Sequence, residues 1–511
     1  MLNKKKRMKD VCALILLLLA LSADLFAQSS QQDPVSVIDT TCNYLQFEDR
    51  LQAQRLRELL DSARFRKIRL AHFGDSHVQM DQFSGMLRNL LQQQFGNAGR
   101  GMIFPYTMAK TYSQSDYKSD FTGSWSTANS IQPVPRIPLG VSGFVAETSD
   151  PAAGFRILFS RGSVKGRGKV YLYCHADSGA YEVEFKCEGS VPQRLPVKAN
   201  PRRGTPLEFS VPEFSDTLSV KFFRSSGSGK LSFYGLSLEG DKPGILYHNL
   251  GVGGAAFLAV LKQVHFEGQF ASIRPDIVLL DWGTNDILYT NSMASDLPGI
   301  IRKTIQKVRA VCPQAVILLP GVQDMNFRAR NISAGLAFSD TLRSIARSHR
   351  CLYYDWYCVS GGKKSMKTWV SLGLGRPDQV HLTKKGYQLK GELLYRAILR
   401  NSEVLNNQEL KSFFLTREEK VSEEIPKEEP SEALPSESVR ESQQKNEKPV
   451  KREKERKKEP AAKSSTAFYV VKKGDTPGGI AQKTGCGLAK LRKLNGLNSD
   501  VIHPGQKLRI K

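Results

Sequence analysis

The sequence predicts an α/β protein whose parallel sheet is interrupted by an inserted block of antiparallel strands. Two continuous apolar runs, DIVLLDWG at 276–283 and AVILLPGV at 315–322, are typical of strands buried on both faces of a parallel sheet. Between the runs and after them, helical periodicity recurs at 297–311, 333–348 and 385–399. Short alternating strands separated by Gly, Ser, Pro and Asp occupy 106–240, a pattern that predicts an antiparallel β-sandwich.

The N-terminus has the pattern of a secretory signal peptide. A basic run (4–9) precedes an apolar run (11–21), and Ala27 provides a small residue before the expected cut, so we assign 1–27 to the signal. The apolar run is short for a membrane span, and Cys12 lies inside it, which argues against a lipid-anchored lipoprotein. We expect an exported, soluble protein without an integral membrane segment after signal removal, in the periplasm, associated with the cell wall or secreted.

The net charge and the cysteine spacing limit the kinds of molecule that this protein is expected to bind. The formal net charge of +24 favours polyanions such as cell-wall polymers or acidic glycans, and export makes nucleic acid an unlikely partner. The cysteines show no metal-binding spacing, so no metal is expected. In an oxidising compartment Cys351 and Cys358 either pair or remain buried thiols.

Three short motifs resemble known binding or catalytic motifs but lack the neighbouring residues or elements that those motifs require. GVGGAA (251–256) has no chain-opening βαβ unit or following acid, and GSGK (227–230) lacks the upstream Gly of a phosphate-binding loop. GDSHV (74–78) lacks the second Gly of the nucleophile elbow. These departures argue against a dehydrogenase, a kinase and an α/β-hydrolase, and no organic cofactor is implied.

The stretch AHFGDSHVQM (71–80) places polar residues on a strand-to-helix turn. A helix is predicted at 52–65, followed by the strand that ends at Gly74 and then by renewed helical spacing from Met80. Ser76 is a candidate nucleophile. Its neighbour His77 is a poor candidate base, because adjacent side chains diverge from the backbone. Asp75 is better explained as a hydrogen-bonding brace of the turn than as a catalytic acid.

A base and its orienting carboxylate are available near the end of the α/β region. In RPDQVHLTKKGY (376–387), Asp378 and His381 are three residues apart in a loop, and Thr383 can cap the following helix. Such a pair can converge so that one imidazole nitrogen faces the carboxylate and the other a serine. An isolated D-x-x-H is more often incidental.

Two further turns offer hydrogen-bond donors for an oxyanion. DWGTNDI (281–287) ends a strand and places Asn285 at the carboxyl edge of the sheet, where α/β proteins bind ligands. NLGVGGA (249–255) offers unobstructed backbone N–H groups. Each turn alone more often serves backbone geometry.

Taken in order, these elements resemble the SGNH (GDSL-like) hydrolase family, over roughly 66–104 and 244–400. The resemblance implies a three-layer α/β domain at 45–105 and 241–405, interrupted by the β-sandwich at 106–240. It implies that Ser76 is the nucleophile, His381 the base and Asp378 its orienter. Ser76, Gly254 and Asn285 would form the oxyanion hole, Gly254 being chosen over its neighbours by alignment with the family's Asn-x-Gly-x-x-Gly pattern. Peptidoglycan O-acetylesterases of this family have a similar plan, with an inserted sandwich like a carbohydrate-binding module.

The C-terminal part divides into a charged segment and a small module. Residues 417–465 are rich in Lys, Glu, Ser and Pro, which predicts a disordered linker. Residues 467–511 resemble a LysM domain, a small α+β (βααβ) module that binds N-acetylglucosamine-containing glycans, with strands at 469–472 and 507–510. The resemblance assigns its glycan groove to Gly474, Asp475, Thr476, Ile502 and Pro504.

Together these expectations describe an exported serine carbohydrate esterase. It would remove O-acetyl groups from peptidoglycan through an acetyl-serine intermediate, targeted by the LysM module. Two alternatives remain open, an acetyl esterase acting on a non-wall polysaccharide such as xylan and a polysaccharide O-acetyltransferase. A purely structural wall-binding protein would leave the ordered catalytic elements unexplained.

Overall fold

The computed structural model describes residues 34–177, 180–197 and 204–400, together with 468–471, 480, 481, 484, 486, 491, 494, 495 and 506–510. It divides the chain into two compact units, Met1–Ile425 and Pro426–Lys511. The expected signal peptide (1–27) and charged linker (417–465) lie outside the described residues. Among the residues that are described, no helix is both long and apolar enough to cross a bilayer.

A seven-stranded sheet forms the centre of the first unit, in the order β1-β20-β17-β16-β2-β15-β3. Its pairs are parallel except that β1 runs antiparallel to β20. The strands are β1 (Leu45–Gln46), β2 (Lys67–Gly74), β3 (Asn97–Gly99), β15 (Gly244–Gly251), β16 (Ile277–Asp281), β17 (Val316–Pro320) and β20 (Leu352–Tyr354). The register places Gly74 beside both Gly251 and Asp281, so β2, β15 and β16 end at the same level.

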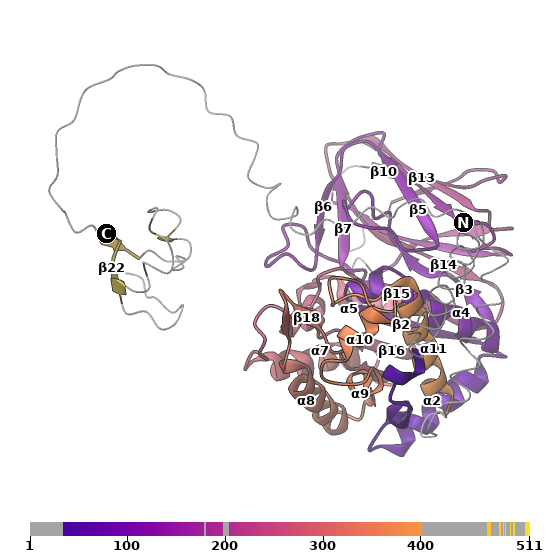
Figure 1. Cartoon of the computed structure of the whole chain (residues 1–511). Helices are drawn as coiled ribbons and strands as arrows, with labels where there is room; N and C mark the ends of the chain where they lie inside the picture. The colour runs from indigo at the N-terminus through magenta and orange to yellow at the C-terminus, as the bar shows by residue number, and fades with distance from the viewer. Residues whose placement is uncertain are drawn as a thin grey trace, which may run out of the picture. The chain divides into compact units, whose positions relative to one another are not determined.

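Helices cover both faces of this sheet because successive residues of each buried strand point to opposite sides. In β16, Ile277 and Leu279 pack into one core cluster and Val278 and Leu280 into another. The first cluster is covered by α2 (Arg50–Ser62), α4 (Phe83–Phe95) and α11 (Lys384–Arg400). The second is covered by η3 (Phe257–Lys262), α5 (Phe266–Ile273), α7 (Leu297–Val311) and α8 (Ala334–Ser348) (Figure 1). The predicted three-layer α/β class is confirmed.

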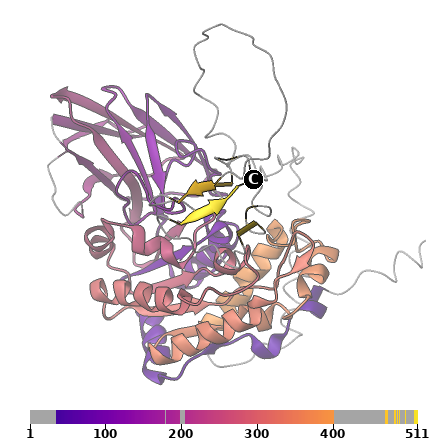
Figure 2. The same cartoon turned by 90° about the vertical axis from the view of Figure 1, so that its left-hand side faces the viewer.

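Antiparallel strands between β3 and β15 build the inserted sandwich. One sheet has the order β11-β10-β13-β8-β5 and the other β12-β9-β14-β7-β6, with β4 also paired to β14. Figure 2 shows these strands as a group distinct from the helices of the α/β domain. The strands are β4 (Gly101–Ile103), β5 (Tyr117–Thr122), β6 (Ser126–Asn129), β7 (Phe144–Thr148), β8 (Gly154–Phe159), β9 (Gly168–Ala176), β10 (Ala180–Cys187), β11 (Gln193–Pro196), β12 (Leu207–Val211), β13 (Thr217–Ser226) and β14 (Leu231–Gly240).

The sandwich and the α/β domain share one apolar core. Phe104 stacks on Phe144 and Phe233 inside the sandwich, and the same buried cluster continues to Phe266 and Phe270 of α5. Because no polar layer separates the two cores, the insertion is an integral part of the first unit.

An ionic network joins the start of α4 to the entry of the insertion, and we call it the seam network. It consists of Asp81, Arg88, Arg100 and Asp116. Arg88 donates two hydrogen bonds of 2.8 Å to the Asp81 carboxylate. Arg100 donates to Asp81 at 3.3 Å and to both oxygens of Asp116 at 2.5 and 2.9 Å. Burial opposes ionisation of Asp116, but the charges of Arg100 and Arg88 outweigh it and lower its pKa to about 2.

The cysteine expectations need correction. Cys358 forms a disulfide with Cys42, 316 positions away in the chain, whereas Cys351 is a buried free thiol. The sequence offered Cys351 as the partner because of its proximity in the chain. The bond actually ties η2 (Thr40–Cys42) to α9 (Trp356–Val359).

The remaining short elements lie around the ends of the sheet. They are η1 (Pro34–Val37), α3 (Ser76–Gln79), α6 (Thr284–Ile287), the β18 (Asn326–Phe327) and β19 (Arg330–Asn331) hairpin, and α10 (Ser365–Ser371). The predicted helix 52–65 corresponds to α2, which begins at Arg50 because Asp49 caps it by accepting from the Leu51 N–H.

In the second unit, β21 (Phe468–Val470) pairs antiparallel with β22 (Lys507–Arg509). Its small core contains Val471, Ile480, Ala481, Cys486, Leu491 and Leu508. The expected groove residues Gly474, Asp475, Thr476, Ile502 and Pro504 lie outside the described residues.

Candidate active site

The strand ends at Gly74, Gly251 and Asp281 bring three loops of the sequence together. Gly74 has to be a glycine, because a Cβ there would lie 2.3 Å from Val78 Cγ2 and 2.8 Å from the Asp281 carbonyl oxygen. The chain then turns directly into α3, whose first residue is Ser76. Asp75 caps this short helix by accepting a 2.9 Å hydrogen bond from the His77 N–H. The half-buried Ser76 side chain is thus presented at the carboxyl edge of the sheet.

The structure places Ser76, His381 and Asp378 in one chain of hydrogen bonds. His381 Nε2 lies 2.9 Å from Ser76 Oγ, and His381 Nδ1 lies 2.8 Å from Asp378 Oδ2. The other Asp378 oxygen accepts from the N–H groups of Val380 and His381 at 3.0 and 2.9 Å. The loop therefore fixes both the carboxylate and the imidazole that it orients, which is the arrangement an acyl-transfer site requires.

Electrostatics keep Asp378 ionised. Partial burial opposes ionisation, but the hydrogen bond and charge of His381, helped by two backbone N–H groups, lower the Asp378 pKa to about 2. The carboxylate can therefore stabilise an imidazolium at His381 throughout the neutral pH range.

In the described part of the chain His77 forms no hydrogen bond with the Ser76 side chain, and it belongs to the wall behind it. Its Nδ1 lies 2.8 Å from the Tyr387 hydroxyl, and its ring centroid is 5.2 Å from that of His381. Burial lowers the pKa of His77 well below its usual value, and the charges of His381 and Lys390 lower it further. A neutral, buried His77 bonded to Tyr387 fits a packing role.

The glycine turn after β15 leaves one N–H group available. The Gly251 N–H donates to Asn249 Oδ1, that of Val252 to the Gly74 carbonyl, and that of Gly253 to Gln79 Oε1. Within the described part of the chain, no acceptor is found for the N–H of Gly254. Gly254 also has a φ of +84°, which favours glycine. This pattern distinguishes Gly254 from Gly251 and Gly253, a choice that sequence alignment alone had made.

Asn285 is held beside this turn at the start of α6. Its side-chain amide donates to the Ala255 carbonyl at 3.0 Å and approaches Asp75 Oδ2 at 3.5 Å. These contacts orient the amide next to Gly254. The N–H groups of Gly254 and Ser76 are donors available for an oxyanion, and the Asn285 amide can join them by giving up its long contact with Asp75.

Two carboxyl groups near these donors have raised pKa values. Burial raises the pKa of Asp75 to about 6, although its hydrogen bond from His77 opposes the shift. Burial likewise raises the pKa of Asp286 to about 7, opposed by the N–H of Phe257 and reinforced by the charge of Asp75. Both groups accept backbone hydrogen bonds, which supports bracing roles for Asp75 and Asp286.

Sequence reasoning missed two residues that meet this site, Gln79 and Tyr112. Gln79 lies one helical turn after Ser76, so the (i, i+3) spacing could have revealed it. Tyr112 lies in the loop between β4 and β5 of the insertion and has no motif around it. A Cβ atom placed on Gly253 would lie only 2.4 Å from the Tyr112 hydroxyl oxygen.

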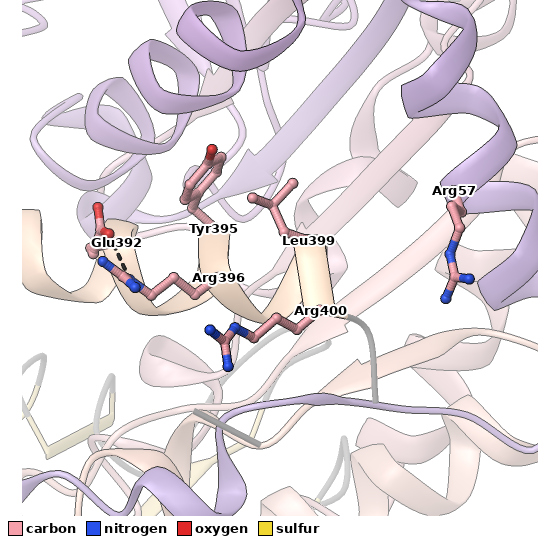
Figure 3. A pocket seen from close by; sticks show the side chains of 6 residues that line it. All are labelled: Arg57, Glu392, Tyr395, Arg396, Leu399 and Arg400. Carbon is pink, nitrogen blue, oxygen red and sulfur yellow. Dashed lines mark hydrogen bonds and ion pairs between the residues drawn. The ribbon is translucent and has the colours of Figure 1, made fainter. Parts of the chain in front are cut away.

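One hollow of the first unit is separate from this site. It has a volume of about 410 Å³ and is lined by Arg57, Glu392, Tyr395, Arg396, Leu399 and Arg400 (Figure 3). Arg396 donates to Glu392, one turn earlier on α11, at 2.7 Å. None of the residues named at the strand ends lines it, so volume alone does not locate the chemistry.

The described residues offer one cluster with the spacing of metal ligands, Asp39, Cys42 and Cys358. The two cysteines form the disulfide and therefore provide no thiolate.

Two protein families match parts of the chain. Residues 227–389 match the GDSL-like Lipase/Acylhydrolase family, and residues 469–511 match the LysM domain. The first match includes Gly254, Asn285, Asp378 and His381 but begins after Ser76. The long insertion, which separates Ser76 from the other site residues, accounts for the partial coverage.

Relatives among characterised proteins match only short segments. A probable endopeptidase p60 of Listeria grayi is 60% identical over 47 residues, which are 9% of this chain and 9% of the relative. The N-acetylmuramoyl-L-alanine amidase sle1 of Staphylococcus saprophyticus is 52% identical over 42 residues, 8% of this chain and 13% of the relative. The chain thus spans a small fraction of the length of these relatives.

A solved structure described as a peptidoglycan O-acetylesterase in action has the same fold. It aligns with a TM-score of 0.56 and 20% identity over 68% of this chain and 95% of that one. The coverage is large enough to include both the α/β domain and an insertion.

Proposed function

The chain carries a GDSL-like lipase/acylhydrolase domain and a LysM domain, and from this premise we propose that it is an exported serine esterase that removes O-acetyl groups from peptidoglycan. The observation that carries the proposal is the continuous hydrogen-bonded chain from Ser76 through His381 to Asp378. Gly254 and Asn285, on the neighbouring loops, support the proposal because ester cleavage needs donors for an oxyanion beside such a chain.

In the proposed reaction, Ser76 Oγ attacks the acetyl carbonyl carbon while His381 Nε2 accepts the Ser76 proton. Negative charge develops on the carbonyl oxygen and is stabilised by the N–H groups of Ser76 and Gly254 and by the Asn285 amide. Collapse of this intermediate breaks the bond to the sugar oxygen, which takes the proton from His381. Asp378 stabilises the imidazolium in both steps.

Hydrolysis of the acetyl-serine completes the cycle. A water molecule gives one proton to His381 as its oxygen attacks the acetyl carbon, and acetate leaves when Ser76 Oγ regains that proton. Each turnover therefore consumes one water and releases one acetate, one proton and a free sugar hydroxyl.

The wall substrate is supported by the second unit and by the relatives. Relatives of this chain include a protein described as an N-acetylmuramoyl-L-alanine amidase, and a structure that shares its fold is described as a peptidoglycan O-acetylesterase. We propose that Gly474, Asp475, Thr476, Ile502 and Pro504 bind N-acetylglucosamine-containing glycan and retain the enzyme at the wall. The full sequence has a net charge of +24, of which 1–27 contribute +3, so the exported chain would carry +21, which favours retention by anionic wall polymers.

The test measures acetate release from O-acetylated peptidoglycan. The Ser76→Ala variant is expected to lose activity by about 10⁴-fold or more, as when other serine nucleophiles are removed. Ser344→Ala, at an exposed position of α8, is the matched control and should retain activity.

Three outcomes would contradict the proposal at different levels. Equal release by Ser76→Ala and wild type would overturn the nucleophile. Release from acetylated xylan but not from peptidoglycan would move the substrate to a non-wall polysaccharide. Acetyl groups that appear on an added saccharide instead of in solution would make the protein an acetyltransferase.

A further inference from the structure

The insertion reaches the esterase site through Gln79. The Gln79 side-chain amide donates to the Tyr112 carbonyl at 2.9 Å and to Thr111 Oγ1 at 3.3 Å, while its oxygen accepts the Gly253 N–H at 2.5 Å. One fully buried side chain therefore connects three parts of the protein: the helix that begins at Ser76, the glycine turn, and the loop between β4 and β5. The position of Tyr112 is fixed relative to the reacting groups.

The Tyr112 hydroxyl lies against the glycine turn without a partner. A Cβ built on Gly253 would be 2.4 Å from this oxygen, so the turn must carry glycine for the hydroxyl to fit. The oxygen is buried and makes no hydrogen bond to any described residue. Buried hydroxyls are nearly always bonded, and an unbonded one costs about 1–3 kcal/mol. Such a group at a reaction site is available for a ligand.

The hydroxyl is a donor rather than an anion. Burial raises the pKa of Tyr112 far above its usual value and the charge of Asp75 raises it further, while the nearby Ser76 hydroxyl opposes the shift. Tyr112 thus keeps its proton at neutral pH, and Ser76 is close enough to influence its pKa.

A second side chain of the insertion borders the same turn. Ile131 Cγ2 lies 3.4 Å from the position a Cβ would take on Gly254, and Lys262 holds this loop by donating to the carbonyls of Ser130 and Gln132 at 3.0 and 2.9 Å. Two separate loops of the sandwich therefore contact the turn that carries the Gly254 N–H.

We propose that Tyr112 is a catalytic residue that the insertion contributes, and that its O–H donates to the oxyanion formed when Ser76 attacks the ester. This assignment rests on the proposed esterase function and extends it. The hydroxyl would add a donor to those of Ser76, Gly254 and Asn285. The sandwich then completes the reaction site, whatever glycan it binds elsewhere.

The test compares Tyr112→Phe with Tyr171→Phe, which removes a hydroxyl at a half-buried position of the insertion beside Glu208 and Glu239. Substrates are 4-nitrophenyl acetate and O-acetylated peptidoglycan. Tyr112→Phe is expected to lower kcat by about 10²-fold on both substrates, the effect of removing one oxyanion donor, with KM nearly unchanged. Tyr171→Phe should keep the wild-type kcat. The melting temperature of each variant is measured in parallel.

The outcomes separate this inference from the proposed function. Wild-type kcat in Tyr112→Phe, or a change in KM alone, would overturn the role of Tyr112 while leaving the esterase intact. A loss on peptidoglycan without a loss on 4-nitrophenyl acetate would also overturn it, because an oxyanion donor acts on both. Activity in Ser76→Ala would overturn the esterase function itself.

Discussion

The seam network and the candidate active site are both buried, but carboxylates are paired with arginines in the first and left without such partners in the second. In the seam network, each of the four carboxylate oxygens of Asp81 and Asp116 accepts a hydrogen bond from an arginine. At the candidate active site, Asp75 is equally buried, yet no ion pair to it is found among the described residues, and burial raises its pKa to about 6. The Gly254 N–H and the Tyr112 hydroxyl are likewise left without protein partners there.

The difference shows that the seam network is held rigidly by paired charges, whereas the candidate active site keeps polar groups available. A buried charge pair is tolerated when both partners are hydrogen-bonded, and the seam network meets that condition where the insertion joins the α/β domain. At the strand ends, unpaired donors lower stability but are pre-oriented toward a substrate. The seam holds the insertion in place so that Tyr112 can contribute to the site.

Breaking the seam network should produce the largest effect. Asp81→Asn preserves side-chain shape and suits the positive φ of 60° at this position, but leaves Arg88 and Arg100 with a neutral partner. We expect the free energy of unfolding to fall by about 3–5 kcal/mol, the range for a broken buried pair. Denaturant unfolding at pH 7 measures it.

The matched control is Asp120→Asn, which removes an exposed bidentate pair with Arg156. Its expected effect is at most about 1 kcal/mol. Similar losses in both variants would show that the seam network is no stronger than a surface ion pair.

Removing an oxyanion donor should have the next largest effect, on activity instead of stability. Asn285→Ala is expected to reduce kcat by about 10²–10³-fold, which corresponds to about 3–4 kcal/mol of transition-state stabilisation. The free energy of unfolding should change far less than in Asp81→Asn. Steady-state kinetics with 4-nitrophenyl acetate and denaturant unfolding provide the two readouts, and undiminished kcat would remove Asn285 from the oxyanion hole.

Neutralising Asp75 should give the smallest effect, and one that depends on pH. In the folded protein Asp75 has a pKa of about 6, above the ordinary value of 3.8, so unfolding releases a proton between these pH values. The ionisation of Asp75 therefore lowers the free energy of unfolding as the pH rises from about 4 to 6. Above pH 6 this loss of stability stays constant. Asp75→Asn can still cap α3 but does not titrate.

The expected result is that Asp75→Asn equals wild type in stability near pH 3 and exceeds it by about 2–3 kcal/mol at pH 8. Because the charge of Asp75 contributes to the raised pKa of Asp286, both proteins carry Asp286→Asn in this comparison, which removes the second titration. A variant that is less stable than wild type at pH 8 would mean that the Asp75 carboxylate is stabilised in the fold.

The fold and the proximity of Ser76, Asp378 and His381 could be predicted because each lies at the end of a readable element. A strand run ends at Gly74, another at Asp281, and the D-x-x-H loop precedes a long helix. Strands of a parallel sheet end on the same edge, so residues far apart in the chain meet there.

The remaining features depend on contacts that no local pattern encodes. Tyr112 reaches Gly253 because Gln79 and the seam network fix one irregular loop of the insertion. Cys358 meets Cys42 because β1 and β20 are neighbours at the edge of the sheet. The sequence left open whether Cys351 pairs with Cys358 or stays a buried thiol, and the structure has it as a buried thiol near Arg309.

The disulfide also has a topological consequence. By joining Cys42 to Cys358 it closes a covalent ring that contains Ser76, the whole insertion and all three strand-end loops of the site, while the loop with Asp378 and His381 lies outside it. Exposed turns of the insertion, such as that around Val191, lie within this ring. A protease that cleaves there opens the ring without releasing a fragment, so the two halves of the enzyme stay linked in a medium that contains other hydrolases.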